Sequence, residues 1–367
     1  MKHLKSYLTA GVFLLVLFGF AAAHLLLPDR DISEAERRKL AKPPQLTTAA
    51  VLSGKYGEDL EDYLLDQFPL RDAFRSLKAE WQLFVWQMKD NNGIYLADGS
   101  ICKLDKELKE NQVNAAVNNA NTVYDTYLQG MNVYFALIPD KNYFAAQANG
   151  YPALDYSGMS DLLAAGLHEN IQYLGMAPFQ SLTLADYYTT DLHWRQERLG
   201  TVVDALSDAM GFASTNPGRY DRTEYPDFYG AYYGQSALRV PADTLVTLSS
   251  PATDAAIVTG AEFAGEKAVY DPSDADNADL YDLYLGGAQA ILTVTNPNGT
   301  AGKDLILFRD SFGSSLAPLL LDSYDTITLI DLRYVTTALL EQYVEFADQD
   351  VLFLYNTGLV NSGMLLK

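Results

Sequence analysis

The sequence predicts an α/β fold, in which β-strands and α-helices alternate along the chain. Short apolar runs of strand type are followed by polar turns and then by segments whose apolar residues have helical spacing. The 367 residues are 49% apolar, which is enough for a sizeable core and too apolar for a disordered chain. This length corresponds to one large domain or two modest ones.

The composition excludes several classes of function. There are 47 acidic and 26 basic residues, so the formal charge is −21. This charge disfavours binding to nucleic acid and binding to anionic lipid through a polybasic segment. Cys102 is the single cysteine, so neither an intramolecular disulfide nor a cysteine-based metal site can form. With only four histidines, a His-rich metal site is also disfavoured, and we expect no cofactor.

The N-terminus predicts a signal peptide or a signal-anchor helix. Lys2 and Lys5 precede an almost wholly apolar run over residues 7–27, and about 20 apolar residues span a bilayer as a helix. Three alanines ending at Ala23 form a small-residue pattern that signal peptidase could cleave, and a buried core helix is the third interpretation. In the first two cases the positive end stays inside, so the rest of the chain lies outside the cytoplasmic membrane, either anchored or secreted.

We expect three parts along the chain. Residues 1–28 are the apolar segment, residues 29–52 form a polar, proline-containing linker, and residues 53–367 form the main domain. Within that domain, residues from about 211 to 303 are rich in Tyr, Gly, Pro, Asp and Thr, which predicts a β-containing insertion.

The individual elements follow from the period of the apolar residues. A helical stretch over 56–88 contains Pro69, which is expected to kink or divide it. Further helices are expected over 105–129, 159–174, 195–210, 314–321 and 336–346. Strands are expected over 94–96, 133–138, 180–184, 305–308, 326–332 and 351–355, with β pieces of the insertion at 244–248 and 290–295.

One histidine lies in a setting that favours chemistry. His193 follows Asp191 by two residues, and in an extended segment such residues point to the same side. A carboxylate placed there can fix the tautomer of the imidazole and stabilise its positive form. The pair is therefore a candidate general base with its orienting acid. The next residue, Trp194, is expected to pack beneath the loop.

A serine follows one of the predicted strands. The apolar run 305–308 continues into Arg309-Asp310-Ser311-Phe312-Gly313, and a helix follows. Ligands of parallel α/β sheets sit at the carboxyl ends of strands, and the amides of a helix N-terminus favour negative charge. Ser311 is therefore a candidate nucleophile with nearby amides as oxyanion donors, and a plain helix N-cap is the structural alternative.

These two segments together resemble the DHHW family of exported bacterial proteins. They are also similar to the wider SGNH-hydrolase-like group, which includes the periplasmic alginate O-acetylation proteins. Ordinary SGNH hydrolases carry the serine motif first, whereas the acetylation branch, like this chain, has Asp-x-His first. The family name has His at its second position, where this chain has Leu192, but the third-position His193 is kept.

The resemblance implies a flavodoxin-like three-layer α/β/α core. It implies Ser311 as the nucleophile, His193 as the base and Asp191 as its orienting acid. Arg333 matches a site arginine of the acetylation proteins or forms a structural salt bridge, and Lys141 lines the site or is structural. The oxyanion donors are expected among the Ser311 amide, Gly286, Gly287 and Asn356.

The leading interpretation is an extracytoplasmic, serine-dependent O-acetyl ester enzyme, an acetyltransferase or an esterase, that acts on a cell-surface polysaccharide. Its expected partners are the polysaccharide or acyl-ester substrate and the membrane, through the N-terminal helix. By likeness to the alginate system, a membrane-bound acyltransferase is a further expected partner. The alternative is a non-catalytic surface protein that keeps the fold and binds a glycan or an assembly partner.

Overall fold

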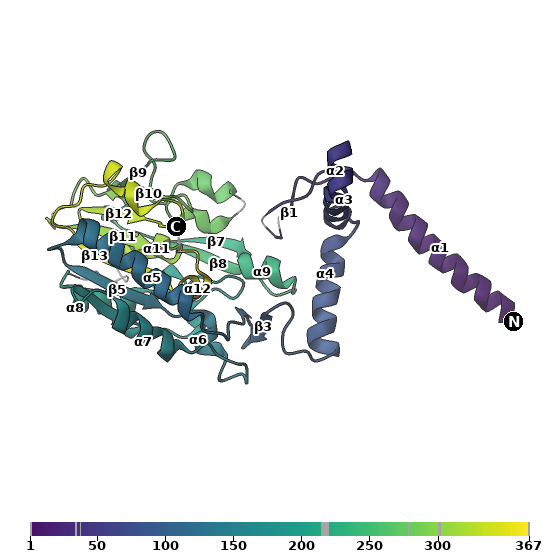
Figure 1. Ribbon diagram of the computed structural model, residues 1–367, viewed down its shortest axis with the longest axis horizontal. Coiled ribbons are helices and arrows are strands. Elements are labelled where there is room, and N and C mark those ends of the chain that lie inside the picture. Colours follow the sequence, from purple (N-terminus) through teal and green to yellow (C-terminus); the bar gives the residue numbers. More distant parts are fainter. Residues whose placement is uncertain are drawn as a thin grey trace. The chain divides into compact units, whose positions relative to one another are not determined.

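A computed structural model describes residues 2–33, 35–36, 38–213, 220–277, 279–299 and 302–365. The chain divides into two compact units, Met1–Asn91 with Tyr233–Arg239 and Asn92–Tyr232 with Val240–Lys367. We call the first the N-terminal unit and the second the α/β unit. Figure 1 shows that the N-terminal unit is mainly helical and that the α/β unit contains the large sheet.

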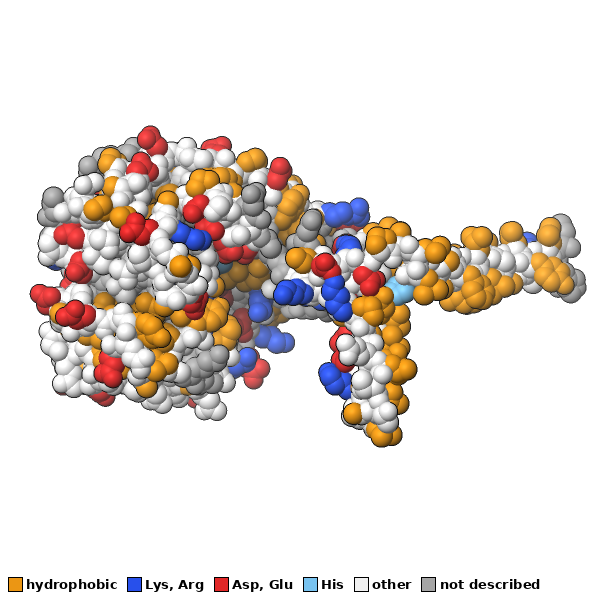
Figure 2. Space-filling model, turned by 90° about the horizontal axis from the view of Figure 1, so that it is seen from above, with side chains coloured by type: hydrophobic (Ala, Val, Ile, Leu, Met, Phe, Trp, Pro, Cys, Tyr) orange, Lys and Arg blue, Asp and Glu red, His pale blue; other side chains and the backbone are white. Residues whose placement is uncertain are grey.

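The N-terminal unit begins with an exposed apolar helix, α1 (Lys2–Leu26). Its segment Leu4–Leu26 is long and apolar enough to cross a membrane. Figure 2 shows hydrophobic side chains along this helix. An N-terminal helix of this kind fits a signal anchor or a signal peptide.

Three helices follow α1 within the N-terminal unit. They are α2 (Thr48–Ser53), α3 (Lys55–Asp66) and α4 (Arg71–Glu80), and a π-helical turn, η1 (Trp81–Val85), extends α4. The break between α3 and α4 contains Pro69, which confirms the predicted division, because proline cannot donate a helical hydrogen bond. Two short strands, β1 (Ile32–Ser33) and β2 (Arg38–Lys39), pair antiparallel.

A seven-stranded sheet is the centre of the α/β unit. Its strand order is β6-β5-β13-β11-β12-β10-β9. The first five strands run parallel, and β10 pairs antiparallel with both of its neighbours. The strands are β5 (Val133–Ile138), β6 (Ile171–Gly175), β9 (Ile257–Gly260), β10 (Ile291–Thr295), β11 (Asp304–Arg309), β12 (Thr326–Ile330) and β13 (Asp350–Asn356).

Helices cover both faces of this sheet. Helices α8 and α11 share one apolar core with residues such as Leu307, whereas α5, α7 and α12 share the other with residues such as Phe308. Neighbouring strand residues point to opposite faces, so a strand buried on both sides is apolar throughout. The bounds are α5 (Glu110–Val123), α7 (Tyr156–Gly166), α8 (Gly200–Met210), α11 (Phe312–Leu316) and α12 (Thr357–Ser362). The predicted three-layer α/β/α class is thereby confirmed.

Smaller elements surround the sheet. Two antiparallel ribbons pair β3 with β4 and β7 with β8. Within the predicted insertion, β9 and β10 join the main sheet, while its residues 214–219, 278, 300 and 301 lie outside the described residues. The remaining bounds are β3 (Ile94–Ala97), β4 (Ser100–Lys103), α6 (Lys141–Ala145), β7 (Asp221–Phe228), α9 (Ala231–Ser236), β8 (Asp243–Ser249) and α10 (Pro251–Ala255).

Two predicted elements between residues 159 and 184 are wrong. Helix α7 ends at Gly166 rather than near residue 174, and the strand lies at Ile171–Gly175 instead of 180–184. Gly166 lies so close to α5 that a Cβ there would be 2.9 Å from Val117. Residues 171–175 then pair with β5. A short apolar run does not distinguish a strand from a helix by its period, and the sheet neighbour decides it here.

Candidate active site

The carboxyl edge of the parallel strands collects most of the predicted site residues. Ser311 follows β11, Lys141 follows β5, Arg333 follows β12, and Asn356 ends β13. Parallel neighbours end at the same edge of a sheet, which is where α/β proteins bind ligands. A loop that contains residues 191–193 lies between β6 and α8 and reaches the same edge.

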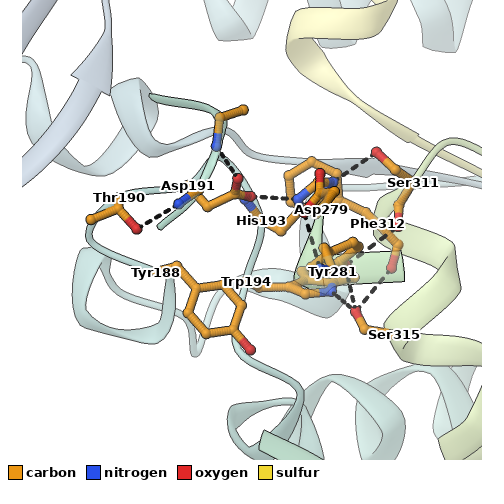
Figure 3. A network of polar contacts seen from close by, with 12 residues as sticks. Tyr188, Thr190, Asp191, His193, Trp194, Asp279, Tyr281, Ser311, Phe312 and Ser315 are labelled. Atoms are coloured by element: carbon orange, nitrogen blue, oxygen red, sulfur yellow. Dashed lines mark hydrogen bonds and ion pairs between the residues drawn. The ribbon is translucent and has the colours of Figure 1, made fainter. Parts of the chain in front are cut away.

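Asp191, His193 and Ser311 form one hydrogen-bonded chain (Figure 3). His193 Nδ1 lies 2.5 Å from Asp191 Oδ1, and His193 Nε2 lies 2.7 Å from Ser311 Oγ. An ionised carboxylate only accepts hydrogen bonds, so Nδ1 carries the proton and Nε2 accepts from the Ser311 hydroxyl. The serine and the histidine thus lie within the hydrogen-bonding reach that the two motifs predicted.

The Asp191 carboxylate is buried and held by three donors. Besides the imidazole, Oδ1 accepts the His193 amide at 2.9 Å, and Oδ2 accepts the Ala231 amide at 2.7 Å. Burial disfavours its ionisation, but its electrostatic interaction with the His193 imidazole and these hydrogen bonds outweigh burial and lower the pKa of Asp191 below its usual range. Asp191 therefore stays negative and can stabilise a positive imidazole.

A glycine permits the close approach of the segment that holds Asp191. A Cβ at Gly230 would collide with Asp191 Cβ and would lie 2.5 Å from Asp191 Oδ2. The Gly230 amide itself donates to Thr190 Oγ1 at 2.9 Å. The missing side chain is what lets the next residue, Ala231, bring its amide to the carboxylate.

Aromatic packing fixes the plane of the imidazole. The Tyr281 ring stacks on His193 with centroids 3.9 Å apart and planes 11° apart. The Tyr281 hydroxyl donates to Ser315 Oγ at 2.9 Å, and Trp194 Nε1 donates to the same oxygen at 2.9 Å. Trp194 is fully buried, as its expected place beneath the loop requires. Figure 3 shows these side chains converging beside the Asp191–His193–Ser311 chain.

Lys141 holds the loop that carries Asp191. Its Nζ donates to three backbone carbonyls, of Tyr188 at 2.7 Å, Thr189 at 3.2 Å and Asp191 at 3.1 Å. Burial lowers the pKa of Lys141 to about 8. The structure thus places Lys141 behind the loop as a positioning group.

Asp243, at the start of β8, fixes the same loop through its side-chain oxygens. Oδ1 accepts the Thr189 amide at 2.9 Å and Arg195 Nη2 at 2.5 Å. Oδ2 accepts the Thr190 amide at 2.8 Å and the Thr190 hydroxyl at 2.6 Å. A buried carboxylate with four donors is well satisfied, so this contact makes the loop rigid.

Asp310 shapes the turn that carries Ser311. Its Oδ1 accepts the Phe312 amide at 3.0 Å, and its Oδ2 accepts the Asn356 amide at 2.7 Å, which joins the turn to β13. Burial raises the pKa of Asp310. The next turn of chain is close to β11, because a Cβ at Gly313 would lie 2.7 Å from Arg309 Cβ.

The candidate oxyanion donors differ in the hydrogen bonds and neighbours that they have. The Ser311 amide donates no hydrogen bond to any described residue, so it remains available. The Asn356 side chain accepts the Gly358 amide at 2.9 Å and caps α12, and its Nδ2 donates to the Ile138 carbonyl at 3.3 Å. Of the two glycines, Gly286 lies against Asp274 and Lys267, and Gly287 lies against Asp282.

Arg333 forms an ion pair behind the serine turn. Its Nη2 lies 2.6 Å from Asp331 Oδ2, and its Nε and backbone amide also donate to Asp331. Burial opposes protonation, but these hydrogen bonds outweigh burial and raise the pKa of Arg333. The salt bridge that the sequence left open is thus present, and a contact with substrate stays a prediction.

Sequence reasoning missed three positioning residues, namely Tyr281, Asp243 and Gly230. Each lies in the segment interpreted as an insertion, and each contacts the Asp191–His193 loop across 39 to 88 residues of sequence. No local pattern marks them, because the contacts exist only after folding. Among the described residues, no group of three or more His, Cys, Asp or Glu could hold a metal ion.

Comparison with known proteins supports the predicted resemblance. A family model described as DHHW protein matches residues 181–330, which include both motif segments. No curated protein sequence matches the chain. The chain is similar to a crystal structure of a DHHW family protein from Eubacterium siraeum, with a TM-score of 0.61 and 20% identity over 75% of this chain and 95% of that one.

Two further solved structures share the fold to different degrees. Bacillus cereus PatB1, in a structure with a sulfonyl adduct, has a TM-score of 0.58 and 16% identity over 74% of this chain and 98% of that one. The O-acetyltransferase domain of Pseudomonas putida AlgJ has a TM-score of 0.43 and 13% identity over 74% of this chain and 92% of that one. The AlgJ likeness is too distant to carry an argument.

The fold and the site define a class: an α/β protein with a mostly parallel sheet, in which an Asp-x-His segment precedes the serine turn in the sequence. The resemblance to the DHHW family is confirmed over residues 181–330. At 16–20% identity, the solved structures show the fold and leave the activity to be argued from the site.

Proposed function

We propose that this chain is a serine-dependent O-acyl ester enzyme that acts on a cell-surface polysaccharide, outside the cytoplasmic membrane. The observation that carries the proposal is the continuous hydrogen-bonded chain from Asp191 through His193 to Ser311. A nucleophile, a base and an orienting carboxylate in this arrangement are what acyl transfer needs. The likeness to the DHHW family and to the PatB1 fold supports the same class.

In the first half-reaction, His193 Nε2 takes the Ser311 hydroxyl proton as Ser311 Oγ attacks the acyl carbonyl. The tetrahedral intermediate collapses when its bond to the leaving alkoxide breaks and that alkoxide takes the proton from His193. The product is an acyl ester on Ser311. Asp191 stays ionised throughout and stabilises the transient imidazolium, and general-base help of this kind is worth about 10²–10⁴-fold.

In the second half-reaction, the acyl group leaves Ser311 for an acceptor hydroxyl. His193 takes the acceptor's proton, the acceptor oxygen attacks the acyl carbon, and Ser311 recovers the proton as its ester bond breaks. Water as acceptor gives an esterase, and a sugar hydroxyl gives an acetyltransferase. The free Ser311 amide is the first donor for the negative oxygen of both tetrahedral intermediates.

The charge of the α/β region favours a neutral acceptor. Residues 92–367 contain 14 basic and 35 acidic residues, so they carry the whole net charge of −21. Such a field opposes the approach of a polyanionic polymer and tolerates a neutral sugar ester. For transfer, we propose a membrane-bound acyltransferase as the partner that supplies the acyl group.

The test is covalent labelling of the full chain followed by ester turnover. A sulfonyl fluoride should label Ser311, located by peptide mass spectrometry, and p-nitrophenyl acetate should be hydrolysed. Ser311→Ala should lose both the label and the turnover. Ser157→Ala is the matched control, since Ser157 is an exposed serine of α7 whose hydroxyl donates to Asp155, two residues earlier in the chain.

Equal labelling of wild type and Ser311→Ala, or turnover that survives the substitution, would exclude Ser311 as the nucleophile. Supplying a neutral oligosaccharide with the acetyl ester then separates the two reactions. Acetylated oligosaccharide in the mass spectrum identifies transfer, and free acetate alone identifies hydrolysis.

A further inference from the structure

Helix α4 and the η1 turn expose a continuous stripe of large apolar side chains. The stripe repeats at intervals of three or four residues, so its members share one face of the helix. Its members are 44–68% exposed, whereas Ala79, on the other side of the helix, is buried. We call it the apolar stripe: Phe74, Leu77, Trp81, Phe84 and Val85 of the helix, with Leu70 just before α4 and Met88 just after η1.

The polar side of α4 is already occupied by the N-terminal unit itself. Glu36 pairs with Arg71 at 2.5 Å and with Arg75 at 3.1 Å. At the far end of the helix, Glu80 pairs with Arg239 at 2.5 Å. The ion pairs fix which side faces the unit, so the apolar stripe is the side that the unit leaves uncovered.

The apolar stripe continues onto α1. The Phe20 ring of α1 stacks on Phe68 at 5.4 Å and meets Phe74 at 5.7 Å, and Phe68 and Phe74 lie 5.9 Å apart. Phe74 belongs to the stripe, and Phe20 belongs to the segment that is apolar enough to cross a membrane. Whatever apolar medium surrounds α1 at Phe20 therefore reaches the start of the stripe.

The charge of this part of the chain is compatible with a lipid surface. Residues 1–91 contain 12 basic and 12 acidic residues and are neutral, in contrast to the net −21 of residues 92–367. A neutral region is neither repelled by anionic headgroups nor dependent on them. Binding there would be apolar in origin, as for helices that lie in the membrane interface.

We propose that the apolar stripe of α4 and η1 lies in the headgroup–acyl boundary of the same bilayer that α1 crosses. Continuity with α1 favours lipid as the occupant of the stripe. Trp81 lies in the middle of the stripe and has the amphipathic ring that prefers this boundary. The N-terminal unit would then hold the membrane by two helices, one that spans it and one that lies on it, independently of the chemistry at Ser311.

The test uses the three tryptophans of the chain. Trp81 is on the stripe, Trp86 is next to it, and Trp194 is fully buried in the α/β unit. We would reconstitute full-length Trp86→Phe protein into phosphatidylcholine vesicles with and without bromine near the top of the acyl chains. The expected result is a loss of emission with brominated lipid. The double variant Trp81→Phe/Trp86→Phe, which keeps only Trp194, should show no loss.

Equal emission of Trp86→Phe in the two kinds of vesicle overturns the proposal. It would mean that the stripe is covered by protein, either a second copy of this chain or the membrane-bound partner, and cross-linking would tell which. Equal quenching in the single and double variants also overturns it, because the quenched group would then be Trp194. Ester turnover should be the same in both variants, which separates this outcome from failure of the proposed enzyme.

Discussion

The two units of this protein use their apolar residues in opposite ways. In the α/β unit, apolar side chains from both faces of the sheet are buried in two cores, and the surface is strongly acidic. In the N-terminal unit, long apolar side chains of α1, α3 and α4 are exposed, and the sequence is neutral. The first pattern is that of a domain folded in water, and the exposed apolar side chains of the second are the basis of the membrane contact proposed above.

The two units also differ in the polar groups that they bury. The α/β unit buries Lys141, Asp191 and Asp243, and it satisfies all three with hydrogen bonds around the loop that carries Asp191. Buried polar groups are expensive unless they are paired, so a cluster of them marks a site where geometry matters more than stability. The N-terminal unit has an ion-pair network as well, in which Glu36 and Asp66 contact Arg38, Arg71 and Arg75, but these described pairs include no histidine or serine side chain.

The largest expected effect is a loss of ester turnover that leaves the membrane contact of the N-terminal unit unchanged. Replacing His193 with Ala should lower acetyl-ester turnover by about 10²–10⁴-fold, because Ser311 loses its general base. The same variant should leave quenching of Trp81 by brominated lipid unchanged. Steady-state hydrolysis of p-nitrophenyl acetate and vesicle fluorescence measure the two effects. Turnover that remains within a few-fold of wild type would contradict the proposed role of His193.

Replacing a glycine with alanine should change the free energy of unfolding in opposite directions in the two units. Gly230→Ala forces a Cβ into Asp191 and should cost about 1–3 kcal/mol of unfolding free energy as well as most of the turnover. Gly57→Ala, in α3, meets nothing within 4 Å and should stabilise its helix by roughly 0.5–1 kcal/mol. Urea unfolding of the full chain in detergent micelles measures both. Unchanged stability and turnover of Gly230→Ala would show that the Ala231 amide can reach Asp191 without the close approach of Gly230.

The lowered pKa of Lys141, a residue of the α/β unit, predicts that the free energy of unfolding depends on pH. Its pKa is about 8 in the folded protein, below the ordinary lysine value of 10.5, so above about pH 8 the unfolded chain holds a proton that the folded protein has lost. The free energy of unfolding of the wild type should therefore rise with pH relative to Lys141→Met, by up to about 1.4 kcal/mol per pH unit. Urea titrations near pH 8 and pH 9 measure the difference. Parallel curves for the two proteins would contradict a buried, depressed lysine.

The smallest expected effect concerns the aromatic support of the base. Tyr281→Phe keeps the stack on His193 and removes the hydrogen bond to Ser315, which should cost about 1 kcal/mol of stability and little turnover. Tyr281→Leu removes the stack as well and should lower turnover further. Comparing the two variants by unfolding and by hydrolysis isolates the ring from its hydroxyl. Equal turnover in both would show that stacking does not orient the imidazole.

Much of the α/β unit could be predicted because its strands are short apolar runs with marked ends. The strands at 133–138, 305–308 and 351–355 are found within a residue of their predicted bounds. The strand at 171–175 was missed because its apolar pattern continues that of α7 and only its pairing with β5 distinguishes it. The helix predicted over 336–346 is a short 3-10 segment, Thr337–Gln342.

The sequence by itself determined the fold class, the apolar N-terminal helix and the identity of the three residues that form the Asp191–His193–Ser311 chain. Each of these is encoded locally, by a period, by a run of apolar residues, or by a motif at a strand end. Only the tertiary structure decided that Lys141 holds the loop and that Tyr281 stacks on the base. Only the tertiary structure, too, left the apolar stripe of α4 exposed on the N-terminal unit. These depend on which distant segments meet, and contacts of that kind are set by packing and burial rather than by any neighbour in sequence.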